Sequence, residues 1–246
     1  METIKRLAHS VFRACGYDFM RYIPENFISL RRMMILKTQS INLFLDVGAS
    51  EGTYALQLRQ LGYEGSILSF EPLSGSFAVL KQRTDRDLLW NCENLALGDS
   101  NEMIEINVSG HKTSSSILPI SEIHISAMSS SGYVDLEKVR VARLDSLKSN
   151  MIKRDAVIYL KVDVQGFEKQ VLDGARETLK QTRVIELELS LAPMYIGGAE
   201  FMEMIKYLTQ LEFKMVSIEP VFTDPNTGQI LQVDGIFVKE EENLSI

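Results

Sequence analysis

Short apolar runs alternate with amphipathic segments along most of this chain, and the alternation predicts strands that are followed by helices. Residues 43–47 form the first apolar run, and a helix is expected over 53–61, where Gly62 ends it. Later elements are expected at 66–70 (strand), 73–83 (helix), 90–96 and 103–108 (strands), 156–162 (strand), 168–180 (helix), 183–189 (strand) and 199–211 (helix). This order is typical of an α/β fold with a largely parallel sheet.

The last two strand patterns differ from the others because only a turn separates them. Residues 213–219 and 230–239 flank the turn sequence TDPNTG, which is too short for a helix that would return the second strand parallel to the first. An antiparallel hairpin is therefore expected at the end of the chain. Such a hairpin suits the Rossmann-like sheet of class I methyltransferases better than a nicotinamide-binding sheet.

The N-terminal residues predict helices rather than strands. One apolar stripe at helical spacing lies within residues 4–12, and a second lies within residues 27–34, after Pro24. We therefore divide the chain into an N-terminal helical cap, residues 1–40, and a main domain, residues 41–246.

A serine-rich stretch, residues 109–135, interrupts the alternation of strands and helices. It has little hydrophobic periodicity, and Pro119 and Gly132 punctuate it. A segment of this length inside a compact domain is usually functional or mobile. We expect a lid or an acceptor-recognition segment here.

The sequence DVGASEG joins the first strand to the first helix and carries the clearest signs of a ligand site. Gly48 and Gly52 allow close approach of a ligand, and Glu71 ends the second strand, where an acid commonly binds ribose hydroxyls. The loop lacks the third glycine of a dinucleotide fingerprint, and Glu51 would repel a pyrophosphate but suits the positive charges of S-adenosylmethionine (SAM). We expect the cofactor to contact Asp46, Gly48, Ala49, Ser50, Glu51, Gly52, Tyr54, Glu71, Pro72, Leu97 and Asp163.

Composition and charge narrow the class of protein further. The 246 residues are 45% hydrophobic and carry a formal net charge of -7, which disfavours nucleic acid as the partner. Residues 1–40 are basic, with seven Lys or Arg against three Asp or Glu, and a solvated helical face explains this better than a membrane contact. Cys15 and Cys92 suggest no disulfide or metal site, and no apolar run reaches the roughly 18 residues that span a bilayer. A soluble cytoplasmic protein is expected, and a homo-oligomer is left open.

Several short motifs, in this order, resemble those of the FkbM-type methyltransferase family. The matching pieces are DVGASEGTY, SFEP, NLALGD, TSSSIL, RLDSL and KVDVQGFEKQVLDGA, and the resemblance covers residues 43 to about 190. The resemblance implies a SAM-dependent enzyme that methylates oxygen in a sugar, a glycolipid or another natural product. Ser50 and Gln165 stand where the family usually has Asn and often has Glu.

An alcohol acceptor needs a base that removes its proton as the oxygen attacks the methyl group. Asp163 follows the strand 156–162 and is therefore expected at the carboxyl edge of the sheet, nearest the methyl group. His111, in the serine-rich stretch, is the second catalytic candidate, although a surface histidine is the simpler interpretation. Asp163, Glu186 and Glu188 form a candidate Mg²⁺ site, with exposed acids at strand ends as an equally supported alternative.

Three other functions compete with methylation of oxygen. An N- or C-methyltransferase of the same fold would differ only in its acceptor pocket. A nicotinamide-dependent oxidoreductase is disfavoured by the missing glycine and the closing hairpin. A catalytically silent SAM-binding module would bind the cofactor without turnover.

Overall fold

A seven-stranded sheet forms the centre of the computed structural model, which describes residues 10–16, 23, 27–111 and 113–240. Its strands are β1 (Leu43–Val47), β2 (Ser66–Phe70), β3 (Trp90–Glu93), β7 (Ile158–Val162), β8 (Thr182–Ser190), β9 (Phe213–Thr223) and β10 (Ile230–Lys239). They lie in the order β3-β2-β1-β7-β8-β10-β9, and β10 alone runs opposite to the other strands of this sheet. The mostly parallel sheet with a closing hairpin is thereby confirmed.

Strands β1 and β7 lie side by side in the middle of this sheet. All residues of both strands are buried, as expected for parallel strands that are covered on both faces. Strand β1 pairs with β2 on one side and with β7 on the other, so the order of the strands reverses there. Ligands of open α/β sheets bind at the carboxyl ends of the strands at such a point.

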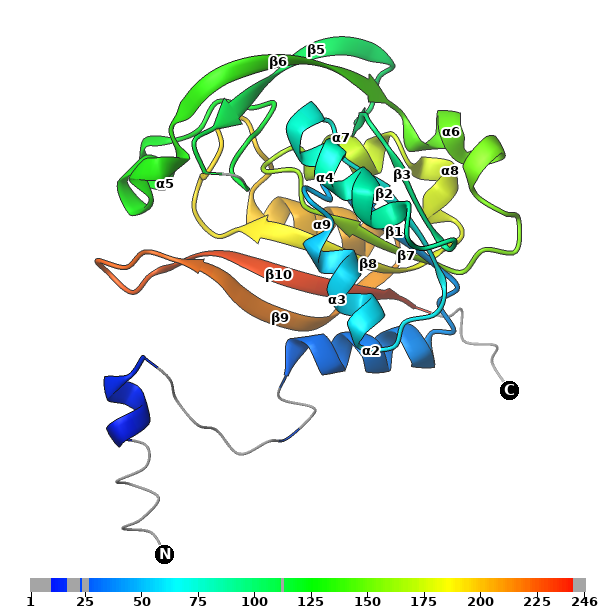
Figure 1. The fold of residues 1–246 in the computed structure, drawn as a ribbon, viewed down its shortest axis with the longest axis horizontal. Helices are drawn as coiled ribbons and strands as arrows, with labels where there is room; N and C mark the ends of the chain where they lie inside the picture. Colours follow the sequence, from blue (N-terminus) through cyan, green and yellow to red (C-terminus); the bar gives the residue numbers. More distant parts are fainter. Residues whose placement is uncertain (1–9, 17–22, 24–26, 112, 241–246) are drawn as a thin grey trace, which may run out of the picture.

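Helices cover both faces of the main sheet (Figure 1). One face carries α2 (Ile28–Thr38), α3 (Thr53–Gln60) and α4 (Ser74–Thr84), and the other carries α6 (Leu144–Met151), α7 (Glu168–Asp173), α8 (Arg176–Leu179) and α9 (Phe201–Gln210). Leu36, Leu58 and Leu80 belong to the core on the first face. Val171 and Leu208 belong to the core on the second face.

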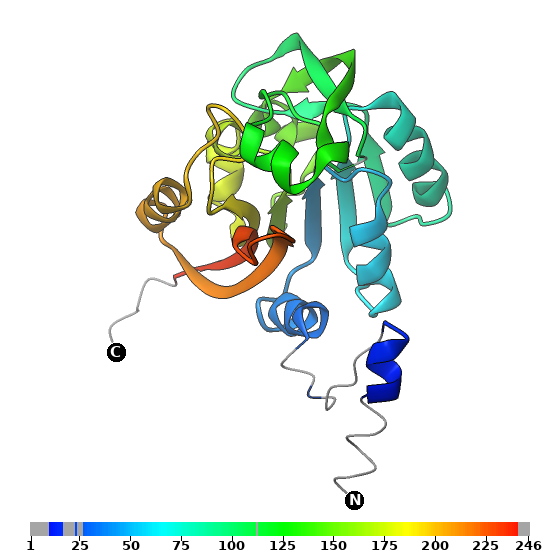
Figure 2. The ribbon, with the colours of Figure 1, turned by 90° about the vertical axis from the view of Figure 1, so that its left-hand side faces the viewer.

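A second sheet contains β4 (Ala96–Leu97), β5 (Glu102–Ser109) and β6 (Tyr133–Ala142). Figure 1 shows the β5–β6 ribbon arching over the main sheet, and β1 points toward it in Figure 2. The single strand expected at 90–96 is thus two strands in different sheets, because the Asn94 amide donates to the carbonyls of Glu71 and Pro72 and turns the chain away. The strand expected at 103–108 belongs to this second sheet.

The segment between β5 and β6 is the predicted lid. It contains α5 (Glu122–Ala127) and the 3₁₀-helix η2 (Ser129–Ser131), so it is more regular than its composition indicates. The Ser116 hydroxyl donates to the carbonyl of Gln165, and the Ser121 amide donates to the carbonyl of Met194. His124 packs between the rings of Tyr195 and Phe222, with ring centroids 5.3 and 5.4 Å away. The lid is therefore fastened to the loops that follow β7 and β8 and to the β9–β10 hairpin.

The helix expected at 168–180 is interrupted at Gly174 and forms α7 and α8 instead. A Cβ atom at Gly174 would lie 1.9 Å from the Gly98 carbonyl oxygen, so the two backbones approach each other closely here. The Asp145 carboxylate accepts hydrogen bonds from the backbone amides of Glu177 and Thr178, and these bonds stabilise the start of α8 as a separate helix. The interruption thus depends on a tertiary contact.

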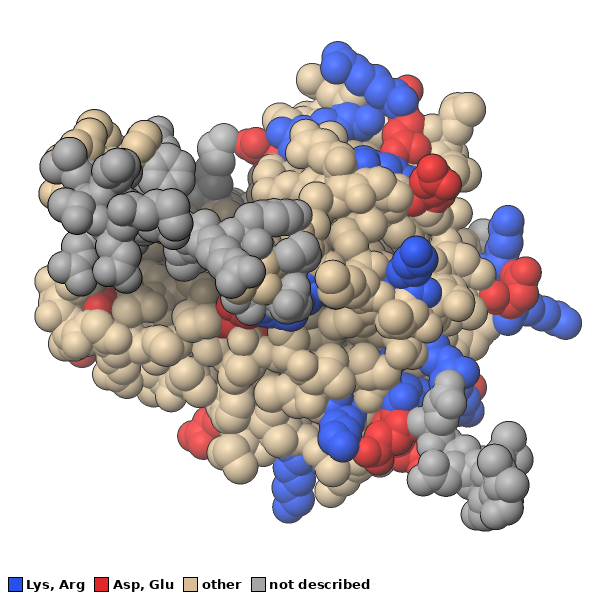
Figure 3. All heavy atoms as spheres, turned by 90° about the horizontal axis from the view of Figure 1, so that it is seen from below, with Lys and Arg blue, Asp and Glu red and all other residues tan. Residues whose placement is uncertain are grey.

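The predicted N-terminal cap is only partly described. Residues 10–14 are helical, and α2 packs against the main sheet, but the apolar positions before residue 10 lie outside the described residues. In Figure 3, which shows the molecule from below, basic and acidic side chains are interspersed on this face. None of the helices that the structure describes has both the length and the apolar character of a bilayer-spanning helix.

Candidate active site

A cavity of about 270 Å³ opens at the carboxyl ends of β1 and β7, below the β5–β6 ribbon. Most of the residues predicted to bind the cofactor line it, namely Asp46, Gly48, Ala49, Ser50, Tyr54, Glu71, Pro72, Leu97 and Asp163. Glu51 and Gly52 are not part of its wall. Gly52 instead begins α3, and a Cβ atom there would lie 2.6 Å from Leu80 and 2.9 Å from Trp90, so its role is to let these elements pack.

Gly48 marks the point where the loop after β1 meets the end of β7. Its φ is +79°, and a Cβ atom would lie 1.8 Å from the carbonyl oxygen of Asp163. Ser50 also has a positive φ, of 48°, in the left-handed region that asparagine adopts more readily than serine. An asparagine, which the resemblance to the FkbM-type family leads us to expect at this position, would suit this loop conformation.

Glu71 ties this loop to the end of β2. Its Oε2 atom accepts the Ser50 amide at 2.7 Å, and its Oε1 atom accepts the Leu73 amide at 2.9 Å. The side chain is buried, and burial raises the pKa of Glu71 to about 7. Each oxygen retains a lone pair, so the carboxylate can still accept hydrogen bonds from a ligand.

Asp46 is fully buried on the cavity wall, and neither of its carboxylate oxygens has a hydrogen-bond partner among the described residues. The nearest cation is Lys161, whose Nζ atom lies 3.9 Å from Oδ1. Burial raises the pKa of Asp46 to about 6. Lys161 is thus the charge that faces this buried carboxylate, and Asp46 contributes negative charge to this end of the cavity.

The opposite end of the cavity is apolar. Leu97 of β4, Ile106 of β5 and Ile117 of the lid line it, together with Pro72 and Leu73. A flat aromatic group such as a nucleobase suits these surfaces. The second sheet and the lid therefore complete a slot whose other wall is formed by the main sheet.

Asp163 projects from the end of β7 into the cavity and is held on both sides. Its Oδ2 atom accepts the Lys161 ammonium at 3.1 Å, and its Oδ1 atom accepts the Gln165 amide at 2.8 Å. Gln165 in turn accepts the Tyr195 hydroxyl and donates to Glu188 at 2.9 Å. The carboxylate of Asp163 is thus fixed in direction while about a third of the side chain remains exposed.

Lys161 and Asp234 line the cavity, but the sequence interpretation assigned neither of them to the site. Burial lowers the pKa of Lys161, but Asp163 and Asp46 outweigh this effect and raise it above the usual value. Burial also raises the pKa of Asp234 to about 7. A charged residue within a mostly apolar strand is rarely buried without a partner or a function. The positions of Lys161 and Asp234 in such strands could therefore have identified both as site residues from the sequence.

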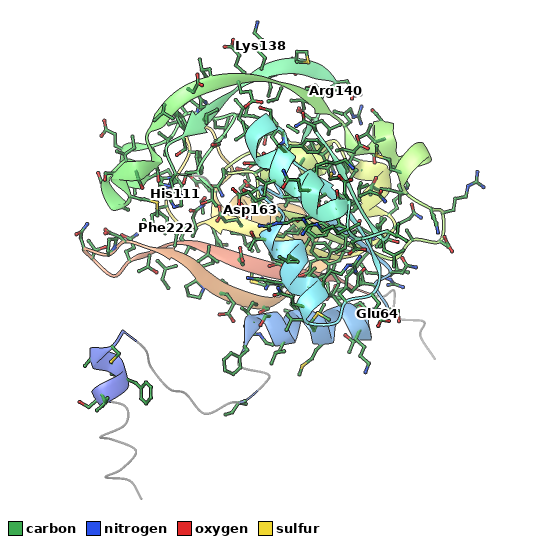
Figure 4. The ribbon with its side chains drawn as sticks, in the orientation of Figure 1. Glu64, His111, Lys138, Arg140, Asp163 and Phe222 are labelled. Carbon is green, nitrogen blue, oxygen red and sulfur yellow. The ribbon has the colours of Figure 1, made fainter. Side chains whose placement is uncertain are left out.

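His111 lies in the lid and is not part of the cavity wall. Its Nδ1 atom contacts the hydroxyls of Thr113 at 3.1 Å and Ser114 at 3.4 Å. In the view of Figure 4, His111 lies to one side of Asp163. The lid residues that reach the cavity are instead Thr113, Ser115 and Ile117.

All three acids of the candidate metal site already accept hydrogen bonds from other side chains, and Asp163 and Glu188 share the Gln165 amide. Glu186 accepts hydrogen bonds from Arg32, Tyr54 and Tyr159, and Glu188 accepts from Gln165 and Gln232. Within the part of the chain that the structure describes, no group of three or more His, Cys, Asp or Glu side chains is arranged to hold a metal ion. The geometry therefore gives no support to a Mg²⁺ site here.

Comparison with known proteins gives a family match over most of this site. A family model described as the methyltransferase FkbM domain matches residues 46–215. The 2-O-methyltransferase NoeI of Sinorhizobium fredii is 25% identical over 199 residues, which cover 77% of this chain and 80% of NoeI. The crystal structure of methyltransferase FkbM from Methylobacillus flagellatus has the same fold, with a TM-score of 0.50 and 14% identity over 80% of this chain. The match covers 43% of that protein, so this chain spans less than half of its length.

Proposed function

The chain belongs to the FkbM methyltransferase family, and we propose that it transfers the methyl group of SAM to a hydroxyl oxygen of a small acceptor such as a sugar, a glycolipid or another natural product. The observation that carries this proposal is the carboxylate of Asp163, fixed by Lys161 and Gln165 on the wall of the cavity. The similarity to a 2-O-methyltransferase supports oxygen as the acceptor atom.

The residues around the cavity fit SAM along its whole length. The negative charges of Asp46, Asp163 and Asp234 around the cavity suit the ammonium of the methionine part, and Glu71 retains lone pairs for the ribose hydroxyls. Leu97, Ile106 and Ile117 offer apolar surfaces for the adenine. The acidic character of the methionine end is also compatible with a sulfonium.

Methyl transfer requires an acceptor oxygen in line with the bond that breaks. SAM, when bound, would supply a methyl group on a positively charged sulfur. The methyl–sulfur bond breaks as the oxygen attacks, and S-adenosylhomocysteine (SAH) is the leaving group. We assign to Asp163 the removal of the acceptor's hydroxyl proton as the oxygen attacks. The hydrogen bonds from Lys161 and Gln165 hold this carboxylate in one direction, and positioning of this kind contributes a large part of the rate.

An Asp163→Asn variant is expected to lose turnover by about 10²–10⁴-fold, since general base catalysis contributes about that factor. SAM affinity should change far less, because an asparagine side chain at this position keeps the shape of the cavity wall. The measurement is SAH formation with a panel of hydroxylated acceptors, run with Mg²⁺ and with EDTA, alongside calorimetric titration with SAM.

His111→Ala is the comparison variant, because it removes the second predicted catalytic residue. Loss of turnover in His111→Ala, with full activity in Asp163→Asn, would assign the proton transfer to His111 instead. Turnover with amines and with no hydroxylated acceptor would replace O-methylation by N-methylation, an alternative that the acidic side chains of Asp163 and Asp234 favour.

SAM binding is expected to release protons and to strengthen as the pH rises from about 5 to about 8. Burial raises the pKa values of Asp46 to about 6 and of Glu71 and Asp234 to about 7, so these groups are partly protonated near neutrality. The positive charges of SAM favour the ionised carboxylates and lower these pKa values, so the free protein holds more protons than the complex. The check is calorimetric titration at pH 6.5 in two buffers with different ionisation enthalpies.

SAH is the matched ligand for this experiment, since it keeps the ammonium and lacks the sulfonium charge. Fewer protons should be released with SAH than with SAM. Proton uptake on SAM binding, or an affinity that falls between pH 5 and pH 8, would contradict the assigned charges.

A further inference from the structure

A buried guanidinium from the N-terminal segment reaches the underside of the cavity wall. Arg32 lies on α2, and its side chain is only 9% exposed. Its Nε atom donates to Glu186 Oε2 at 2.9 Å, its Nη2 atom donates to Glu186 Oε1, and Nη2 lies 3.7 Å from Asp234 Oδ2. A charge buried to this extent requires such partners, so α2 is held in one position on the sheet.

The carboxylate of Glu186 is the centre of this contact. Besides Arg32, it accepts the Tyr54 hydroxyl at 2.6 Å and the Tyr159 hydroxyl at 2.5 Å. Three of the four hydrogen bonds converge on Oε2, and the fourth, from Arg32 Nη2, goes to Oε1. Burial and the negative charge of Glu186 raise the pKa values of both tyrosines, which therefore remain donors.

Tyr54 connects this buried cluster with the cavity. It lines the cavity, whereas Arg32 and Glu186 do not. Two cations lie near its ring, with the Arg32 guanidinium carbon 4.8 Å and the Lys161 Nζ atom 4.9 Å from the centroid. Cations near a tyrosine ring and a hydrogen bond at its hydroxyl together restrict the side chain.

We propose that Arg32 is a positioning residue of the cofactor site, which acts through Tyr54 and Asp234 and makes α2 a functional part of that site. Without the guanidinium, Glu186 becomes a buried carboxylate that has lost its counter-ion, and Lys161 is the nearby cation that it then attracts. Movement of Glu186 and Lys161 toward each other shifts Lys161 and Tyr54, both of which line the cavity. The inference deepens the proposed function and rests on SAM binding in this cavity.

The test is the SAM affinity of Arg32→Met, measured by calorimetry at a temperature where circular dichroism shows the variant to be folded. We expect binding to weaken by roughly tenfold, within the range of coupling between contacting groups. The matched control is Arg31→Met. Arg31 is the preceding residue of the same helix, and it pairs with Glu219 at the partly exposed outer side of the sheet. Its removal should leave the affinity for SAM unchanged.

A double-mutant cycle separates positioning from general stabilisation. Tyr54→Phe and Tyr159→Phe each remove one hydroxyl that donates a hydrogen bond to Glu186. Of the two tyrosines, only Tyr54 lines the cavity. The effect of Arg32→Met on SAM affinity should be much smaller in the Tyr54→Phe background and nearly unchanged in the Tyr159→Phe background.

If Arg32→Met does not fold, Arg32→Lys takes its place, since lysine keeps the charge but lacks the planar fork that binds Glu186 twice. A folded variant at Arg32 that binds SAM as the wild type does, with only a lower melting temperature, would overturn the proposal. Additive effects of Arg32→Met and Tyr54→Phe would overturn it as well. A wild-type protein that binds no SAM would instead contradict the proposed function.

Discussion

Glu71→Ala is expected to weaken SAM binding by at least about a hundredfold, because hydrogen bonds to a charged group contribute about 1.5–3 kcal/mol each and two ribose hydroxyls lose their acceptor. The substitution also removes the acceptor of the Ser50 amide, at 2.7 Å, and of the Leu73 amide, at 2.9 Å. The loop after β1 thus loses its connection with the end of β2. Calorimetric titration with SAM and SAH measures the effect.

Two further variants separate the causes of this loss. Glu71→Gln keeps the size of the side chain and one acceptor oxygen, so its effect should lie between those of the wild type and the alanine variant. Glu64→Ala removes the same type of residue from an exposed position remote from Asp163 (Figure 4) and should bind SAM normally. Unchanged affinity in Glu71→Ala would exclude Glu71 from the cofactor site.

Gly48→Ala is expected to lower the free energy of unfolding by about 2–5 kcal/mol, from the left-handed backbone and from the overlap with a neighbouring atom. The added Cβ atom would lie 1.8 Å from the carbonyl oxygen of Asp163, which is backbone and cannot rotate away. Because the same overlap separates the ends of β1 and β7, SAM binding should be lost too. Urea denaturation and SAM titration measure the two effects.

Gly75→Ala provides the control for this substitution. Gly75 lies in α4, and a Cβ atom there would have no heavy atom within 4 Å. Alanine favours a helix over glycine by about 1 kcal/mol or less, so Gly75→Ala should be neutral or slightly stabilising. A Gly48→Ala protein with the stability of Gly75→Ala would show that the loop is free to move away from Asp163.

Local sequence was sufficient to predict most elements of the main sheet. The apolar runs at 43–47 and 66–70 became β1 and β2 with the expected bounds, since strands buried on both faces form nearly continuous apolar runs. The closing hairpin followed from the length of its turn. The helix at 168–180 and the strand at 90–96 were each predicted as one continuous element, but each is divided in two. The helix is interrupted where it meets the backbone of Gly98, and the strand is interrupted where Asn94 binds the end of β2.

The candidate site was predictable where its residues follow strands in short motifs. Asp46, Gly48, Glu71 and Asp163 all line the cavity, because parallel strands end at the same edge of a sheet. Asp234 comes to the same edge on an antiparallel strand, with no motif around it. His111 was chosen by residue type alone, and the lid presents its neighbours Thr113 and Ser115 to the cavity instead.

The sequence by itself determined the class of fold, the family and most of the residues that line the cavity at the end of β1, because these depend on periodicity and on motifs a few residues long. Only the tertiary structure decided which buried charges meet. Arg32, Glu186 and Asp234 lie far apart in the chain, and their contact depends on how α2 and the last hairpin pack on the sheet. The partners of a buried charge are set by geometry across the whole fold, and no local pattern of residues records them.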